Sequence, residues 1–129
     1  MDFDIATLPL AELLGVELVT AQPDRVVGRL TVREEITTGN DILHGGAFMA
    51  FADTLGAIGA VLNLRAGAGT TTLESKTNFL GSARVGDTIT GEATPLHVGR
   101  RSSVWQTRIT NADGKLLTMV TQTQMTLEG

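Results

Sequence analysis

The sequence predicts an α+β fold in which an antiparallel sheet is wrapped on a single long helix. One stretch, from 45 to about 64, is mostly apolar and spaces its bulky residues with a helical period. Strand-like segments precede this stretch and fill the chain after it. The links between successive strands are short, and short links favour antiparallel pairing.

A short helix and two strands are expected before the long helix. Residues 8–14 are amphipathic, and Pro9 lies in the first turn, where a helix tolerates proline. The segments that follow are a strand at 16–21, a turn at Gln22-Pro23-Asp24, a strand at 25–32 and a polar loop at 33–43.

Four strands are expected after the long helix, which the flexible segment Arg65-Ala66-Gly67-Ala68-Gly69 ends. They lie at 70–80, 88–98, 102–110 and 116–127, with turns at 81–87, 99–101 and 111–114. In the last strand, one face carries Leu117, Met119, Thr121, Thr123, Met125 and Leu127, and the other carries Thr118, Val120, Gln122, Gln124 and Thr126.

Length and composition narrow the class of protein. The 129 residues predict one domain, 1–129, and 42% hydrophobic with 19% charged residues indicates a folded chain. The net charge of −4 argues against a broad nucleic-acid binder. The absence of cysteine excludes a disulfide framework, a thiolate zinc site and a thiol nucleophile. We expect a cytoplasmic protein without a membrane or nucleic-acid partner.

Two segments resemble targeting or membrane sequences only superficially. Met1-Asp2-Phe3-Asp4 begins acidic and lacks the basic region of an export signal. The stretch 45–64 is long enough to span a membrane, but nearly half of it is Gly and Ala and it carries Asp53 in its middle. A charge there costs about 2.5–3.5 kcal/mol, so a core helix is the preferred interpretation.

The long helix has two different sides. At about 100° per residue, one stripe collects the bulky apolar side chains Phe48, Phe51, Leu55, Ile58 and Leu62, which we expect to pack into the concave face of the sheet. The opposite side collects Asp53 with Gly46, Met49, Ala50, Gly56, Ala57 and Ala60.

The side with the small residues has two interpretations. In the first interpretation, this side faces water and Asp53 is an ordinary solvated residue. A solvent-facing side of a helix usually carries Lys, Glu or Gln, and this side carries none of them. Alternatively, a backbone, a second copy of the helix or a ligand approaches it closely, and Asp53 lines a cleft. In such surroundings the charged carboxylate is penalised by desolvation unless a dedicated donor supports it.

The start of the helix carries His44-Gly45-Gly46. Helix N-termini present free N–H groups and the positive end of the helix dipole, and glycine lets a substrate carbonyl approach them. Gly46 and Asp53 project on nearly the same side, roughly 10 Å apart along the axis. A substrate lying along the helix would then meet both groups. A histidine at such a position also has a plain interpretation as a capping or packing residue.

These residues resemble a known family. Leu43-His44-Gly45-Gly46-Ala47 followed by Ala52-Asp53-Thr54 is similar to the hotdog-fold acyl-CoA thioesterases, in the branch of phenylacetate-pathway (PaaI-like) thioesterases. The run Pro95-Leu96-His97-Val98-Gly99-Arg100-Arg101, with Val104-Trp105-Gln106, is similar to aryl- and hydroxynaphthoyl-CoA thioesterases. The resemblance covers about residues 10–127, and its strength comes from the spacing of His44 and Asp53 together with the order of strands.

The resemblance implies a fold and a set of roles. It implies a five- or six-stranded antiparallel sheet around the helix, and a dimer with two interfacial sites or a dimer-of-dimers tetramer. Asp53 is then the general base or nucleophile, and the N–H of Gly45, with that of Gly46, forms an oxyanion hole. His44 holds the site in shape. Thr72 supplies a hydroxyl to the nucleophilic water from the other subunit.

Two positions depart from the family pattern. Thr38 stands six residues before the histidine, where relatives carry Asn or Gln, so that Asn40 is the nearest amide. Ala57 stands four residues after the acid, where some relatives carry Ser or Thr, which leaves Thr72 as the hydroxyl candidate. Glu74 shares a strand face with Thr72 by a period of two and is a further cleft candidate, or an exposed partner of a neighbouring charge.

The substrate implied is an acyl- or aryl-CoA thioester, which the enzyme hydrolyses to acid and CoA without a cofactor. Because CoA carries phosphates, local cations are needed, and the candidates are Arg84, Arg100 and Arg101. His44 and His97 lie on different elements and no metal-ligand pattern is present. Two rival interpretations remain: a hotdog hydratase or dehydratase acting on acyl thioesters, and a non-catalytic module that binds acyl groups or a partner protein.

Overall fold

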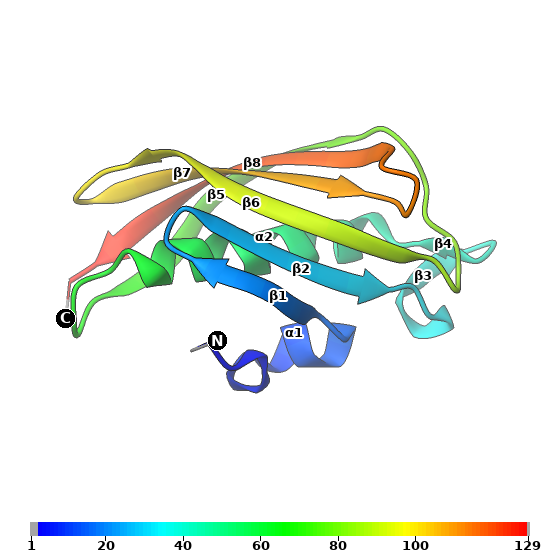
Figure 1. The fold of residues 1–129 in the computed structure, drawn as a ribbon, viewed down its shortest axis with the longest axis horizontal. Coiled ribbons are helices and arrows are strands. Elements are labelled where there is room, and N and C mark those ends of the chain that lie inside the picture. The colour runs from blue at the N-terminus through cyan, green and yellow to red at the C-terminus, as the bar shows by residue number, and fades with distance from the viewer. Residues whose placement is uncertain (1–2, 129) are drawn as a thin grey trace.

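The computed structural model describes residues 3–128 and shows a six-stranded antiparallel sheet curved around one long helix (Figure 1). The order of strands in the sheet is β1-β2-β6-β7-β8-β5. The main elements are α1 (Pro9–Leu14), β1 (Glu17–Gln22), β2 (Arg25–Thr31), α2 (Gly45–Leu62), β5 (Gly69–Phe79), β6 (Thr88–Val98), β7 (Ser102–Thr110) and β8 (Leu116–Leu127). Both the α+β class and the wrapped helix are confirmed.

Helix α2 lies in the concave side of the sheet and forms the centre of the core (Figure 1). The side chains of Phe48, Phe51, Leu55 and Ile58 are at most 2% exposed, as the helical stripe predicts, and Leu62 at the end of the helix is partly buried. By length and mean hydropathy (1.5), α2 could span a membrane, but half of its residues are buried inside the sheet. These are properties of the core helix of a wrapped sheet.

Two glycines in the sheet allow this close approach. Gly28 on β2 and Gly91 on β6 face each other in the register of the two strands. A Cβ atom at Gly91 would lie 2.6 Å from Leu55 Cδ1 and 3.1 Å from the Phe51 ring. Phe51 and Leu55, in the middle of α2, therefore pack directly against the backbone of β2 and β6 at these two glycines.

The connection between β5 and β6 differs from the expectation. The short segment 81–87 predicts that these strands pair, but β5 pairs with β8, and β6 pairs with β2 and β7. Helix α2 runs beneath the sheet and delivers the chain to the edge beyond β8. The segment 80–87 then carries it back to the middle of the sheet.

The expected polar loop at 33–43 contains a 3-10 turn (Glu34–Ile36) and two short strands, β3 (Thr37–Gly39) and β4 (Ile42–Leu43). Asn40 and Asp41 form the tip of this hairpin with φ of 52° and 58°. Asn and Asp tolerate this left-handed conformation, which two-residue hairpin turns require. Since β4 ends at Leu43, the hairpin leads directly into the start of α2 (Figure 1).

Candidate active site

Asp53 is the only charged residue of α2, and its carboxylate is half-buried against the sheet. Its Oδ1 atom accepts two hydrogen bonds, from Thr72 Oγ1 on β5 at 2.6 Å and from Gln122 Nε2 on β8 at 3.0 Å. Hydrogen bonds to a charged oxygen are stronger than those between neutral groups and hold the carboxylate plane in one orientation. The sequence predicted that a charged Asp53 needs a dedicated hydrogen-bond donor, and the structure provides two, Thr72 and Gln122.

A chain of hydrogen bonds continues behind Thr72. Gln124 Nε2 donates to Thr72 Oγ1 at 2.6 Å, and Gln124 Oε1 accepts from Thr70 Oγ1 at 3.0 Å. A hydroxyl has one proton, so a Thr72 that accepts from Gln124 directs its own proton to Asp53. Along this hydrogen-bond network, each donor therefore points to the group that is nearer to Asp53 Oδ1.

The other carboxylate oxygen, Oδ2, accepts no hydrogen bond from residues 3–128, and Asp53 borders a cavity of about 280 Å³. The cavity is lined mainly by apolar groups: Leu8, Pro9, Leu10 and Ala11 around α1, and Thr54 and Ala57 of α2. An oriented carboxylate with one free oxygen beside an apolar cavity can take a proton from water or attack an electrophilic carbon.

His44 is the N-cap of α2. Its Nδ1 accepts the N–H of Gly46 at 2.7 Å, and its carbonyl accepts the N–H groups of Ala47 and Phe48. The cap occupies the N–H of Gly46, so the expected oxyanion role of Gly46 would require this hydrogen bond to break and stays a prediction. The N–H of Gly45 has no acceptor in the part of the chain that the structure describes, and it points from the positive end of the helix dipole.

Gly45 and Asp53 do not meet within one chain. Eight residues separate them, which corresponds to about 12 Å along the helix axis. Reacting groups must approach to about 3–3.5 Å, so one thioester carbonyl cannot contact both groups of the same chain. A substrate lying along α2 could therefore pass both groups, but its thioester carbonyl can contact only one of them.

The small residues of α2 are explained mainly by the sheet. A Cβ atom at Gly56 would lie 2.2 Å from Gln122 Oε1, and one at Gly59 would lie 2.5 Å from the ring of Trp105. Gly56 and Ala60 are buried, so the interpretation as a solvent-facing side is wrong for them. A close approach was expected, and at Gly56 the approaching group is a side chain of the protein's own β8.

Thr72 and Glu74 differ from the sequence expectations. Thr72 contacts Asp53 of its own chain, so it does not need the other subunit to reach the acid. A bulge between Thr72 and Glu74 places the extra residue Leu73 in β5, which shifts the alternation by one. Glu74 consequently lies on the outer face, where it accepts from Thr123 Oγ1 at 2.8 Å, and its assignment to the cleft is wrong.

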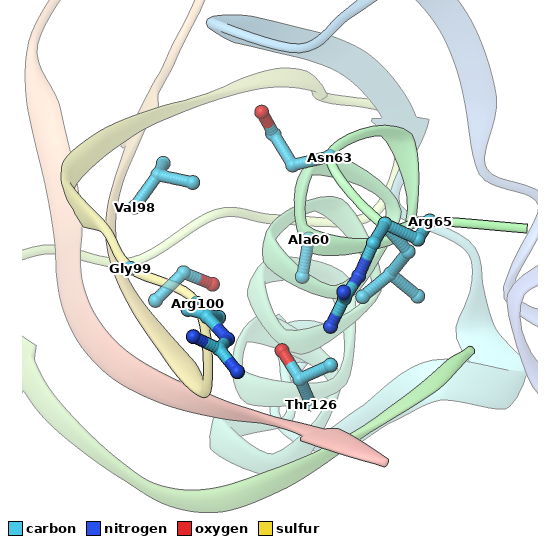
Figure 2. A pocket seen from close by; sticks show the side chains of 9 residues that line it. Ala60, Asn63, Arg65, Val98, Gly99, Arg100 and Thr126 are labelled. Atoms are coloured by element: carbon cyan, nitrogen blue, oxygen red, sulfur yellow. The ribbon is translucent and has the colours of Figure 1, made fainter. Parts of the chain in front are cut away.

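The three candidate arginines occupy opposite ends of α2. Arg84 lies beside Ile42, near the start of the helix, and its backbone N–H donates to Asp87. Arg100 and Arg101 lie near the end of the helix and border a cavity of about 580 Å³ together with Arg65. Figure 2 shows Arg65 and Arg100 extending into a neighbouring pocket of about 180 Å³. Arg100 and Arg101 therefore form a cluster of cations with Arg65, whereas Arg84 lies apart from it.

Two other residues of the expected site lie away from Asp53, and their roles stay predictions. Asn40 is exposed at the hairpin tip, and Thr38 is exposed in β3; neither makes a side-chain hydrogen bond to another described residue. Between residues 3 and 128, no group of three or more His, Asp or Glu side chains is arranged to hold a metal ion.

Gln122, Gln124 and Thr70 were not predicted as site residues. Both glutamines lie on the inner face of β8 and are at most 1% exposed. The alternation of residues 116–127 put them on one face, and two glutamines on one face of a strand were the available signal. The sequence did not show which face is inside. The other face carries more apolar residues, yet from Met119 onward it is the more exposed one, and only Leu117 at its start is buried.

Comparison with known proteins supports a hydrolase. Residues 40–118 match the family model described as thioesterase superfamily. The chain is 32% identical over 108 residues to a 1,4-dihydroxy-2-naphthoyl-CoA hydrolase of Listeria monocytogenes, covering 84% of this chain and 87% of the relative. It is 30% identical over 106 residues to the proofreading thioesterase EntH of Cronobacter turicensis, covering 82% and 77%.

Solved structures agree with this relationship. A thioesterase from Haemophilus influenzae superposes with a TM-score of 0.89 at 27% identity, over 96% of this chain and 86% of that one. The AziG protein of S. sahachiroi superposes with a TM-score of 0.90 at 28% identity, over 94% and 98%. With the wrapped helix and the His-Gly-Gly segment at its start, these matches establish that the chain belongs to the thioesterase superfamily and has its hotdog fold.

Proposed function

We propose that this thioesterase hydrolyses an acyl- or aryl-CoA thioester, with Asp53 as general base or nucleophile and the N–H of Gly45 as oxyanion donor. The observation that carries the proposal is the Asp53 carboxylate: Thr72 and Gln122 hold its Oδ1, its Oδ2 accepts no hydrogen bond from residues 3–128, and the residue borders a cavity. Base catalysis takes the proton of the attacking water on Oδ2. Nucleophilic catalysis forms an acyl-aspartate that water then hydrolyses.

The active site is composed of two copies of the chain. Because Gly45 and Asp53 lie about 12 Å apart along one helix, the carbonyl bound at Gly45 meets Asp53 of the partner subunit. β5 is an edge strand of the sheet, it contributes Thr72 to the site, and its Leu73 and Phe79 are 58% and 52% exposed. A long edge strand with exposed apolar residues favours pairing with a second copy.

The acyl group proposed is aromatic or otherwise apolar. The ring of Phe79 lies 3.3 Å from the position of a Cβ atom at Gly45 and meets Phe48 edge-to-face, with centroids 6.3 Å apart. An aromatic acyl group at the Gly45 N–H would contact this half-exposed ring. The name of the Listeria relative, a hydrolase of an aromatic CoA thioester, supports the same class of substrate.

The phosphates of CoA are assigned to Arg100 and Arg101. These residues lie beside the end of α2, roughly 15 Å along the helix from Asp53, which leaves room for the pantetheine arm between thioester and phosphates. Arg65 is a weaker candidate because its guanidinium already pairs with Glu128 at 2.7 Å.

Asp53→Asn tests the proposal directly. The asparagine retains one oxygen to accept from Thr72 and Gln122, so the fold is kept, but it can neither take a proton nor attack. We expect thiol release from benzoyl-CoA or another CoA thioester substrate to fall about 10²- to 10⁴-fold, the range of a lost general base. A variant with wild-type turnover on every hydrolysed substrate contradicts the assigned chemistry.

The composite site has its own test, which uses Gly45→Pro. Proline at the first position of a helix is tolerated, the preceding His44 already has the extended conformation (φ −62°, ψ 137°) that proline requires, and the substitution removes the N–H. Chains carrying Asp53→Asn and chains carrying Gly45→Pro, unfolded and refolded together, form mixed dimers with one intact site. Random pairing restores about one quarter of the wild-type activity. A mixture as inactive as its parents places both groups in one chain.

A further inference from the structure

We propose that Gln122 is a positioning residue for the reaction: its buried amide holds Asp53 so that only Oδ2 is presented to the substrate. The inference rests on the proposed function of Asp53 and adds a residue from β8, 69 positions away in the sequence. Thr72 reaches the same Oδ1 from β5, so two strands grip one oxygen of the carboxylate from different directions.

Contacts at both polar atoms of the Gln122 amide fix its position. The residue is 0% exposed, and its Nε2 donates to Asp53 Oδ1 at 3.0 Å. Its Oε1 lies against α2 at Gly56, where a Cβ atom would come within 2.2 Å of it and within 2.4 Å of Cδ. Because Gly56 has no side chain, there is space for the Gln122 amide against α2. Gly56 lies about one helical turn from Asp53, the residue that this amide contacts.

The second polar atom of the Gln122 amide has no hydrogen-bond partner in the part of the chain that the structure describes. Gln122 Oε1 is buried and accepts no hydrogen bond from any group in residues 3–128. A buried carbonyl oxygen without a donor destabilises the folded state, and an apolar side chain of similar shape would avoid this. Its bond to Asp53 and this unpaired oxygen have opposite effects on stability, so the amide is better explained by orientation of the carboxylate than by stability of the fold.

The main test replaces Gln122 with Met, which has a similar length and no amide. We expect kcat for a CoA thioester to fall about ten- to hundredfold, as for a lost hydrogen bond to a charged group, while KM changes less than kcat. The melting temperature should change little, because the lost hydrogen bond to Asp53 is offset by removal of the unpaired oxygen. Gln122→Glu, which places a second carboxylate against Asp53, lowers kcat further than Gln122→Met.

A second route displaces the amide without altering it. The methyl group of Gly56→Ala collides with Gln122 and should lower kcat in the wild-type background. In a Gln122→Ala background, where the space is empty, Gly56→Ala should cause no further loss. Thr123→Val is the matched control on β8, because Thr123 lies on the opposite face from Gln122 and its side chain donates to Glu74; its kcat should equal that of the wild type.

The outcomes separate this inference from the proposed function. If Asp53→Asn is inactive and Gln122→Met has wild-type kcat, the positioning role is wrong and the role of Asp53 stands. If Asp53→Asn retains full activity, the proposed function itself fails. Gln122 acts only through the carboxylate, so Gln122→Met must add nothing to the residual rate of Asp53→Asn; an equal loss in both backgrounds overturns the inference, as does a melting temperature that falls in parallel with kcat.

Discussion

Replacing Thr72 with Val separates the two tasks of one hydroxyl group. The hydroxyl donates to Asp53 Oδ1 at 2.6 Å and accepts from Gln124 Nε2 at 2.6 Å. Valine has nearly the same shape and does neither. The carboxylate then loses one of its two donors, and the amide of Gln124, which is 1% exposed, loses its acceptor.

The expected magnitudes follow from these two losses. A hydrogen bond to a charged group contributes about 1.5–3 kcal/mol, which corresponds to roughly a ten- to hundredfold decrease in kcat if it orients the reacting carboxylate. A buried amide N–H left without a partner costs about 1–3 kcal/mol of stability. Thr72→Val should therefore lower both kcat and the free energy of unfolding.

Steady-state thiol release measures the first effect, and urea unfolding monitored by the fluorescence of Trp105 measures the second. Thr72→Ser keeps the hydroxyl and should remain close to wild type in both, and Thr71→Val makes the same change on the exposed residue next to it. Wild-type kcat in a destabilised Thr72→Val would show that the hydroxyl supports only the sheet. Wild-type values of both quantities would refute the hydrogen-bond chain altogether.

Three further variants test the core, the helix cap and the cation cluster. Gly59→Ala should destabilise the fold by about 1–3 kcal/mol in urea unfolding, because its methyl group meets the buried and hydrogen-bonded ring of Trp105; an unchanged midpoint contradicts the packing. His44→Ala should cost about 0.5–2 kcal/mol by exposing the Gly46 N–H, and His44→Asn, which can cap, should recover most of it; equal losses in both rule out the cap. Arg100→Ala should raise KM for a CoA thioester and leave KM unchanged for the N-acetylcysteamine thioester of the same acid, which lacks phosphates; equal effects on both substrates argue against phosphate binding.

The local features of this protein were readable in its sequence. The period of Phe48, Phe51, Leu55 and Ile58 marked the buried side of α2, since the angle between successive residues of a helix does not depend on what surrounds it. Asp53 stood out because a single charge among Gly and Ala requires a partner. The start of the helix at His44-Gly45 and the positions of most strands followed from turn and capping residues in the same way.

The partners of Asp53 depended on contacts between distant segments. Thr72 and Gln122 reach it only because β5 pairs with β8 and not with β6, which follows it in the chain. The bulge at Leu73 turned Glu74 away from the cleft, and a bulge changes the face of every later residue without altering the local pattern.

The sequence by itself determined the wrapped-helix architecture, the acid at its centre and the glycine N–H at its start, because helical period, turns and caps depend on neighbouring residues. Only the tertiary structure decided which face of β8 lies inside and which donors hold the carboxylate. Those properties depend on strand order and on register, which bring together residues that no local pattern relates.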